Sequence, residues 1–125
     1  MLILDTHAWI WFVTESNQLG KDATKVLSNE RFCGISAISC WEVAMLVEKK
    51  RIEFKFPIEQ WLNLALEKVQ LLPLTPEVAI LASRLSPFHG DPADRIITAT
   101  AIINQSNLIT KDERIISSNL VKTIW

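Results

Sequence analysis

The chain has 125 residues, of which 49% are hydrophobic and 22% charged, and its 14 acidic and 13 basic residues give a formal net charge of −1. The length suits one domain with one core, and the apolar fraction excludes an intrinsically disordered chain. The near-neutral charge argues against a protein that holds nucleic acid by bulk positive charge, so a nucleic-acid role needs local support.

Short apolar runs alternate with amphipathic segments along the chain. In order, we predict strand 1–4, helix 6–13 capped by Thr6, helix 20–30, strand 32–35, a helix from Ser36 or Ser39 to about Lys50, helix 57–69, strand 70–74, helix 75–85, helix 91–105, strand 107–110, helix 113–118 and strand 121–125. Continuous apolar strands that alternate with helices indicate an α/β fold with a parallel sheet covered on both faces.

The sequence gives no sign of export, membrane insertion or a disulfide. Residues 1–4 are apolar but carry no basic leader, and Asp5 interrupts them too early for a signal peptide. No stretch approaches the roughly 18 uncharged apolar residues of a membrane span. Cys33 and Cys40 form no zinc-binding pattern and are interpreted as reduced core thiols. We therefore expect a cytoplasmic protein without membrane contact.

Four carboxylates fall where the predicted strands and their following helices meet. They are Asp5, Glu42, Asp94 and Asp112. In an open parallel sheet the functional crevice lies beyond the carboxyl ends of the strands, so we expect these side chains to share one edge. Three of the four stand beside strongly apolar sequence, where repulsion and desolvation raise their energy unless a cation compensates.

Each carboxylate also has an ordinary structural explanation. Asp5 suits a turn or cap after a strand, and the remaining candidates are helix caps or capping boxes: Ser39 with Glu42, Asp91 with Asp94, and Thr110 with Glu113. The conjunction of four favours a metal site instead. Oxygen ligands without histidine or cysteine select a hard cation, Mg²⁺ or Mn²⁺, and such ions support phosphodiester hydrolysis.

Four motifs, in order along almost the whole chain, resemble a PIN domain and, within that family, the VapC-type ribonuclease toxins of bacterial toxin-antitoxin pairs. They are LILDTH at 2–7, SAISCWEV at 36–43, HGDPADRIITATA at 89–101 and LITKD at 108–112. The resemblance implies a single PIN domain over residues 1–125, a three-layer α/β/α sandwich with a mostly parallel sheet of about four to five strands.

The resemblance also implies a function. Its acidic catalytic and metal-binding set falls on Asp5, Glu42, Asp94 and Asp112. The implied activity is that of a Mg²⁺-dependent endoribonuclease toxin, with Mn²⁺ possible, that cleaves RNA by metal-activated water. The implied partners are a VapB-like antitoxin whose tail lies across the groove, and a second copy in a homodimer. The alternative is a catalytically silent PIN-like module that binds RNA or protein.

Several further residues are candidates to support the four carboxylates. Hydroxyls near the carboxylates either orient them or cap helices, Asp91 is favoured as a helix cap over a metal ligand, and two cations adjoin proposed ligands, where they contact phosphate or form ordinary ion pairs. These residues are Thr6, Ser39, Thr110, Asp91, Arg95 and Lys111. We assign no general-base role to His7 or His89, and the five tryptophans are read as core, interface or base-stacking residues.

This sequence lacks residues that two other classes of phosphate-handling protein need. A phosphatase of the haloacid dehalogenase type needs a second aspartate two residues after the first, and position 7 is His7. A receiver domain needs an aspartate at the end of a central strand, and the predicted strand 70–74 offers none.

Overall fold

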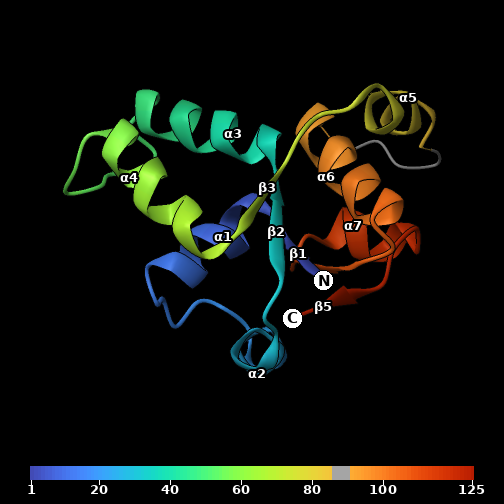
Figure 1. Cartoon of the computed structure of the whole chain (residues 1–125), viewed down its shortest axis with the longest axis horizontal. Helices are drawn as coiled ribbons and strands as arrows, with labels where there is room; N and C mark the ends of the chain where they lie inside the picture. Colours follow the sequence, from blue (N-terminus) through green and yellow to red (C-terminus); the bar gives the residue numbers. More distant parts are fainter. Residues whose placement is uncertain (86–90) are drawn as a thin grey trace.

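The computed structural model describes residues 1–85 and 91–125, so His89, to which we assign no general-base role, lies outside the described residues. Its elements, in chain order, are β1 (Leu2–Leu4), α1 (Thr6–Val13), α2 (Lys21–Asn29), β2 (Cys33–Ser36), α3 (Ala37–Glu48), α4 (Ile58–Ala65), the 3₁₀ turn η1 (Leu66–Lys68), β3 (Gln70–Leu72), α5 (Pro76–Arg84), α6 (Pro92–Ile103), β4 (Asn107–Ile109), α7 (Glu113–Ser118) and β5 (Thr123–Ile124) (Figure 1).

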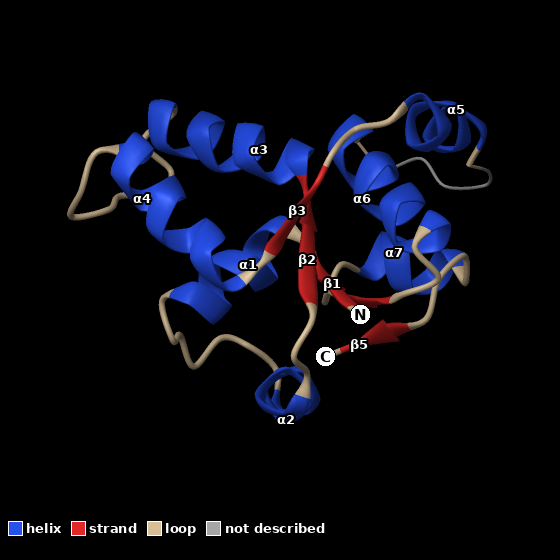
Figure 2. Ribbon diagram, viewed as in Figure 1, coloured by secondary structure: helices blue, strands red, loops and turns tan. Residues whose placement is uncertain are grey.

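The strands form one parallel sheet in the order β3-β2-β1-β4-β5, which places β1 at the centre. Helices α1, α3 and α4 lie on one side of this sheet and α5, α6 and α7 on the other (Figure 2). This is the three-layer α/β/α arrangement, and the α/β prediction with a sheet covered on both faces is confirmed. No helix among the described residues is long and apolar enough to cross a membrane.

Two hydrophobic cores lie on opposite faces of the sheet because strand side chains alternate in direction. Leu4 and Ile109 contribute to the core that contains Trp9 of α1. Their neighbours Ile3 and Leu108 contribute to the core on the other face, with α5, α6 and α7. Cys33 is buried in the first core, and both cysteines are free, as predicted.

The register of the three central strands brings their carboxyl ends level. Leu4 of β1 pairs with Ile35 of β2 on one side and with Ile109 of β4 on the other. The backbone N–H of Asp5 extends this ladder by donating to the Ile109 carbonyl at 3.1 Å. The residues that follow these strands therefore emerge along one edge of the sheet.

Two expected helix caps, Thr6 and Thr110, were wrong, and of the two expected starts of the third helix, Ser36 and Ser39, the structure has Ser36. Asp5, not Thr6, caps α1 by accepting from the backbone N–H of Ala8. Ser36, not Ser39, caps α3, and Asp112, not Thr110, caps α7. The hydroxyls of Thr6, Ser39 and Thr110 do not cap helices, so they can form other hydrogen bonds.

The remaining differences concern lengths. The predicted helix 57–69 is divided into α4 and η1, and the predicted strands 70–74 and 121–125 shrink to three and two paired residues. These strands lie at the two edges of the sheet, where each has a hydrogen-bonding neighbour on one side only. An apolar run in the sequence predicts that a segment is buried, whereas the length of the strand depends on how many residues pair with the neighbouring strand.

Candidate functional site

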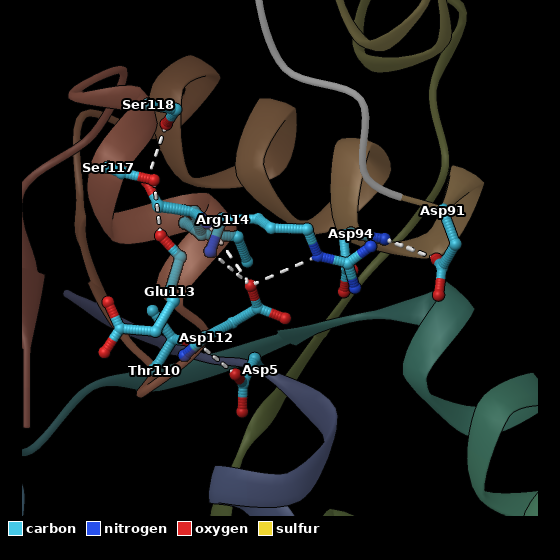
Figure 3. A network of polar contacts seen from close by, with 10 residues as sticks. Asp5, Asp91, Asp94, Thr110, Asp112, Glu113, Arg114, Ser117 and Ser118 are labelled. Atoms are coloured by element: carbon cyan, nitrogen blue, oxygen red, sulfur yellow. Dashed lines mark hydrogen bonds and ion pairs between the residues drawn. The ribbon is translucent and has the colours of Figure 1, made fainter.

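A cavity of about 480 Å³ opens at the carboxyl edge of the sheet. It is lined by side chains from α1, α3, α6 and the β4–α7 segment, namely Asp5, Thr6, His7, Trp11, Glu42, Asp91, Asp94, Lys111, Asp112 and Arg114. All four carboxylates predicted from the sequence thus line one cavity. Figure 3 shows three of them, Asp5, Asp94 and Asp112, with Arg114 reaching across.

Asp5 is fixed at the end of the central strand by bonds to both carboxylate oxygens. Its Oδ1 accepts from the backbone N–H of Ala8 at 2.8 Å, and its Oδ2 accepts from the hydroxyl of Thr110. Thr110 is fully buried, and its Oγ1 also accepts from the backbone N–H of Asp112 at 3.1 Å. One buried hydroxyl therefore connects two of the four acidic residues.

Glu42 accepts a hydrogen bond from the buried hydroxyl of Thr6, which lies beside the buried hydroxyl of Ser39. Thr6 of α1 donates to Glu42 Oε1, and the Oγ atoms of Thr6 and Ser39 lie 3.0 Å apart. Thr6 is 3% exposed and Ser39 is 0% exposed, so water does not compete for these hydroxyls. The capping-box interpretation of Ser39 and Glu42 is wrong, because Ser39 lies inside α3 and Glu42 is turned towards α1.

Asp94 lies in the first turn of α6, where its backbone N–H donates to Asp91 Oδ1 at 3.1 Å. Asp91 is therefore the N-cap predicted from the sequence, and it also lines the cavity. The Asp94 side chain is 16% exposed. A carboxylate this close to the start of a helix is favoured by the helix dipole, although its burial opposes ionisation.

Asp112 caps α7 and belongs to an ion-pair network with Asp94. Asp112 Oδ1 accepts from the backbone N–H of Arg114 at 2.9 Å and of Ile115 at 3.3 Å. The Arg114 guanidinium lies 3.8 Å from Asp112 Oδ1 and 3.6 Å from Asp94 Oδ2. Arg114 thus links the two carboxylates, and its side chain is 62% exposed.

Negative charge is costly in this cavity. Burial raises the pKa of Asp5 and of Glu42, and the hydrogen bonds from Thr110 and Thr6 only partly oppose this. Burial, followed by repulsion from Asp91, Asp112 and Glu42, raises the pKa of Asp94 to about 7 despite the nearby Arg114. The site is therefore short of positive charge.

The donor chemistry of the cavity fits a hard divalent cation. Its candidate ligands are all carboxylate oxygens, which suit Mg²⁺ or Mn²⁺, and a cation would relieve the repulsion that raises the pKa of Asp94. Within residues 1–85 and 91–125, no three acidic, histidine or cysteine side chains already form a metal cage. Arg114 supplies positive charge to Asp94 and Asp112 in this arrangement.

One wall of the cavity is aromatic and basic. The Trp11 ring lies 5.6 Å from the His7 ring and 5.8 Å, edge-on, from the Trp125 ring, measured between centroids. The Lys111 ammonium lies over Trp11, 4.7 Å from its centroid. Trp9, two residues before Trp11, is fully buried. The two tryptophans therefore face different surroundings, Trp9 the core and Trp11 the cavity.

Sequence reasoning misplaced one cation, Arg95, and missed another, Arg114. Arg95 does not line the carboxylate cavity; it lies along a separate cavity between α5 and α6, with Leu74 and Ala79, because successive helix residues point about 100° apart. Arg114 was not predicted as a site residue. Its only sequence signal is its position two residues after Asp112, on the first turn of a helix.

Comparison with known sequences assigns the chain to a protein family. Residues 2–118 match the PIN domain family. The chain is also 38% identical over 127 residues to Ribonuclease VapC22 of Mycobacterium tuberculosis, with 99% of this chain and 98% of the relative covered. The chain belongs to the PIN domain family, and its likeness is to the VapC type.

Solved structures show the same fold. A toxin-antitoxin complex from Klebsiella pneumoniae matches with a TM-score of 0.74 at 20% identity, covering all of this PIN domain and 97% of that chain. VapBC2 from Rickettsia felis, bound to a promoter DNA fragment, matches with a TM-score of 0.70 at 14% identity and covers 98% and 96%. FitAcB from Neisseria gonorrhoeae matches at 0.68 with 21% identity, covering 100% and 97%.

Proposed function

We propose that this PIN domain is a Mg²⁺-dependent endoribonuclease and the toxin of a toxin-antitoxin pair. The observation that carries the proposal is that Asp5, Glu42, Asp94 and Asp112 line one cavity in a chain 38% identical to a VapC ribonuclease. These four carboxylates would hold the cation, with Mn²⁺ as an alternative to Mg²⁺. When bound, the cation would activate water and stabilise charge on the phosphate oxygens.

The protein side chains have separable tasks in this proposal. Thr110 and Thr6 orient Asp5 and Glu42 by donating to their oxygens, which leaves each carboxylate with further lone pairs for a cation. Arg114 and Lys111 reach the same cavity and would lie against the phosphodiester, where they favour the extra negative charge of the transition state. Neither histidine is needed as a base.

The same family likeness supports the proposed partners. The solved relatives include toxin-antitoxin complexes, which favours a VapB-like antitoxin as a partner of this chain. We propose that the tail of this antitoxin covers the carboxylate cavity.

We also propose that residues 1–125 act as one PIN domain in the cytoplasm and that two copies form a homodimer. Light scattering of the purified protein would give twice the chain mass for a dimer.

The decisive experiment measures cleavage of total cellular RNA by the purified protein. We expect cleavage with Mg²⁺, none with excess chelator, and a loss of at least about 100-fold in Asp5→Asn, because that change removes a charged ligand. Asp22→Asn is the matched control, since Asp22 lies on α2 and lines a different surface hollow.

Two results would contradict the proposal. Equal cleavage with Mg²⁺ and with chelator would exclude the metal role, and full activity in Asp5→Asn would exclude the carboxylate role. RNA binding without any cleavage would favour the catalytically silent module instead.

A further inference from the structure

We infer that the aromatic and basic wall of the cavity, formed by Trp11 and Lys111, is a nucleotide-binding subsite in which a base stacks on the Trp11 ring and Lys111 contacts a phosphate. The inference rests on the proposed function, because it places a nucleotide of the RNA beside the carboxylates. It assigns a substrate-positioning role to two residues outside the acidic set.

The first observation is where Trp11 lies. Its side chain is only partly buried, and it lines the same cavity as the four carboxylates. Ligand pockets usually measure about 300–1,000 Å³, so a cavity of about 480 Å³ has room for one nucleotide beside the carboxylates. An indole that serves only the core would be enclosed, as Trp9 is.

The second observation is that Trp11 is held in place by other rings. His7 lies against it at a tilt of 52°, and Trp125 meets it edge-on at 64°. A ring supported in this way loses little conformational freedom when a ligand binds. It is therefore a ready platform for a planar base, and stacking on an aromatic side chain tolerates any of the four bases.

The third observation is the cation over this ring. Lys111 is exposed, and its ammonium lies 4.7 Å from the Trp11 centroid and 6.0 Å from that of Trp125. Trp11 packs partly against the core, but the ring face beneath the ammonium is covered by this flexible side chain. A nucleotide would exchange this contact for two others, with its base on the ring and its phosphate near the ammonium.

The test separates the base from the phosphate. The probes are the four ribonucleoside 5′-monophosphates and ribose 5-phosphate, titrated with Mg²⁺ present while the indole N–H signals are followed by NMR. We expect at least one nucleotide to bind about 10-fold more tightly than ribose 5-phosphate and to shift the Trp11 signal. In Trp11→Leu this advantage should fall to about 2-fold or less, whereas Trp11→Phe should retain most of it.

Matched controls exclude general effects. Phe32 is 66% exposed at the opposite edge of the sheet, so Phe32→Leu should bind all probes like the wild type. Lys111→Met should weaken nucleotides and ribose 5-phosphate by the same factor, whereas Lys122→Met, an exposed lysine at the opposite edge, should weaken neither.

The inference is overturned if no nucleotide binds better than ribose 5-phosphate, or if the advantage persists in Trp11→Leu. These outcomes do not depend on RNA cleavage. A protein that cuts no RNA but shows the Trp11-dependent advantage would refute the proposed function and leave the subsite intact.

Discussion

The carboxylate cavity has two halves that are built differently. In the sheet half, Asp5 and Glu42 accept hydrogen bonds from the hydroxyls of Thr110 and Thr6, which are almost completely buried. In the helix half, Asp94 and Asp112 lie at the starts of α6 and α7 and share the exposed guanidinium of Arg114.

One site can thus combine carboxylates that are held by buried hydroxyls with carboxylates whose partner cation is exchangeable. Hydroxyls packed between sheet and helices cannot leave without disturbing the core, so the sheet half is preorganised. An exposed arginine at 3.6–3.8 Å is held weakly, so the helix half can exchange this cation for another. We expect the sheet half to set the geometry of the site, and the helix half, through Asp94, to add a pH response near neutrality.

The largest expected effect is a fall in the stability of the metal-free protein as pH rises. Asp94 has a pKa of about 7 when folded, against about 3.9 in an unfolded chain, so the folded state binds its proton more tightly. The stabilising contribution of the Asp94 proton is therefore full below about pH 4 and is lost as pH rises towards 7, which lowers the free energy of unfolding by at most about 4 kcal/mol. Urea denaturation in chelator between pH 4.5 and 8 measures it.

Two variants measure the share of Asp94 in this pH dependence. Asp94→Asn should remove that share and be more stable than the wild type at pH 8, whereas the remote Asp22→Asn should keep the whole decline. The decline that remains in Asp94→Asn comes from Asp5 and Glu42, whose pKa is also raised by burial. Mg²⁺ should restore stability at pH 8 in the wild type, because it binds the ionised carboxylates. A metal-free wild type whose stability rises between pH 4.5 and 7 would break the comparison.

An intermediate effect is expected in the sheet half. Thr110→Val keeps the shape but removes the donor to Asp5 and the acceptor for the Asp112 N–H. Loss of a group that orients a metal ligand typically costs about 10–100-fold in metal affinity or activity. Mg²⁺ titration of RNA cleavage should show this loss, and Thr110→Ser should restore much of it.

The chain offers a matched control for this change. Thr98 is fully buried on α6, and its hydroxyl has no hydrogen-bond partner within the described ranges. Thr98→Val should therefore leave cleavage unchanged and the fold no less stable. Equal behaviour of the two valine variants would show that Thr110 only fills space.

The smallest effect is expected from Arg114→Gln. This change removes the cation that links Asp94 and Asp112, and exposed ion pairs contribute about 0.2–1 kcal/mol. The Mg²⁺ concentration for half-maximal binding, measured by calorimetry, should fall about 2–5-fold. Arg84→Gln makes the same charge change at an exposed position of α5 and should not alter the Mg²⁺ affinity. A weaker Mg²⁺ affinity in Arg114→Gln would show that Arg114 supports the metal.

The fold and the acidic set were accessible from sequence because each depends on local pattern. Apolar runs such as residues 2–4 predict a buried strand, and the level carboxyl ends of parallel strands then bring Asp5 and Asp112 to one edge. The sequence also indicates which hydroxyl residues lie near the carboxylates, but it does not show which hydrogen bonds they form. Whether Thr6 caps its own helix or donates to Glu42, 36 residues away, is decided by how α1 packs on α3.

Arg114 and the orientation of Arg95 could not be predicted for a related reason. Arg114 faces two aspartates only because α6 and α7 lie on the same side of the sheet. Arg95 adjoins Asp94 in sequence, but one step along a helix turns it towards α5. Residues that are adjacent in the sequence of a helix can therefore line different cavities.

The ladder bond from the Asp5 amide to Ile109 also has a consequence for hydrogen exchange. That amide directly follows the central strand of the sheet and continues its ladder, so its hydrogen should exchange with solvent only when the whole domain unfolds. The Asp94 amide is bonded to a side chain at an exposed helix start and should exchange by fraying of one turn. Deuterium would then enter the two halves of one cavity on very different timescales.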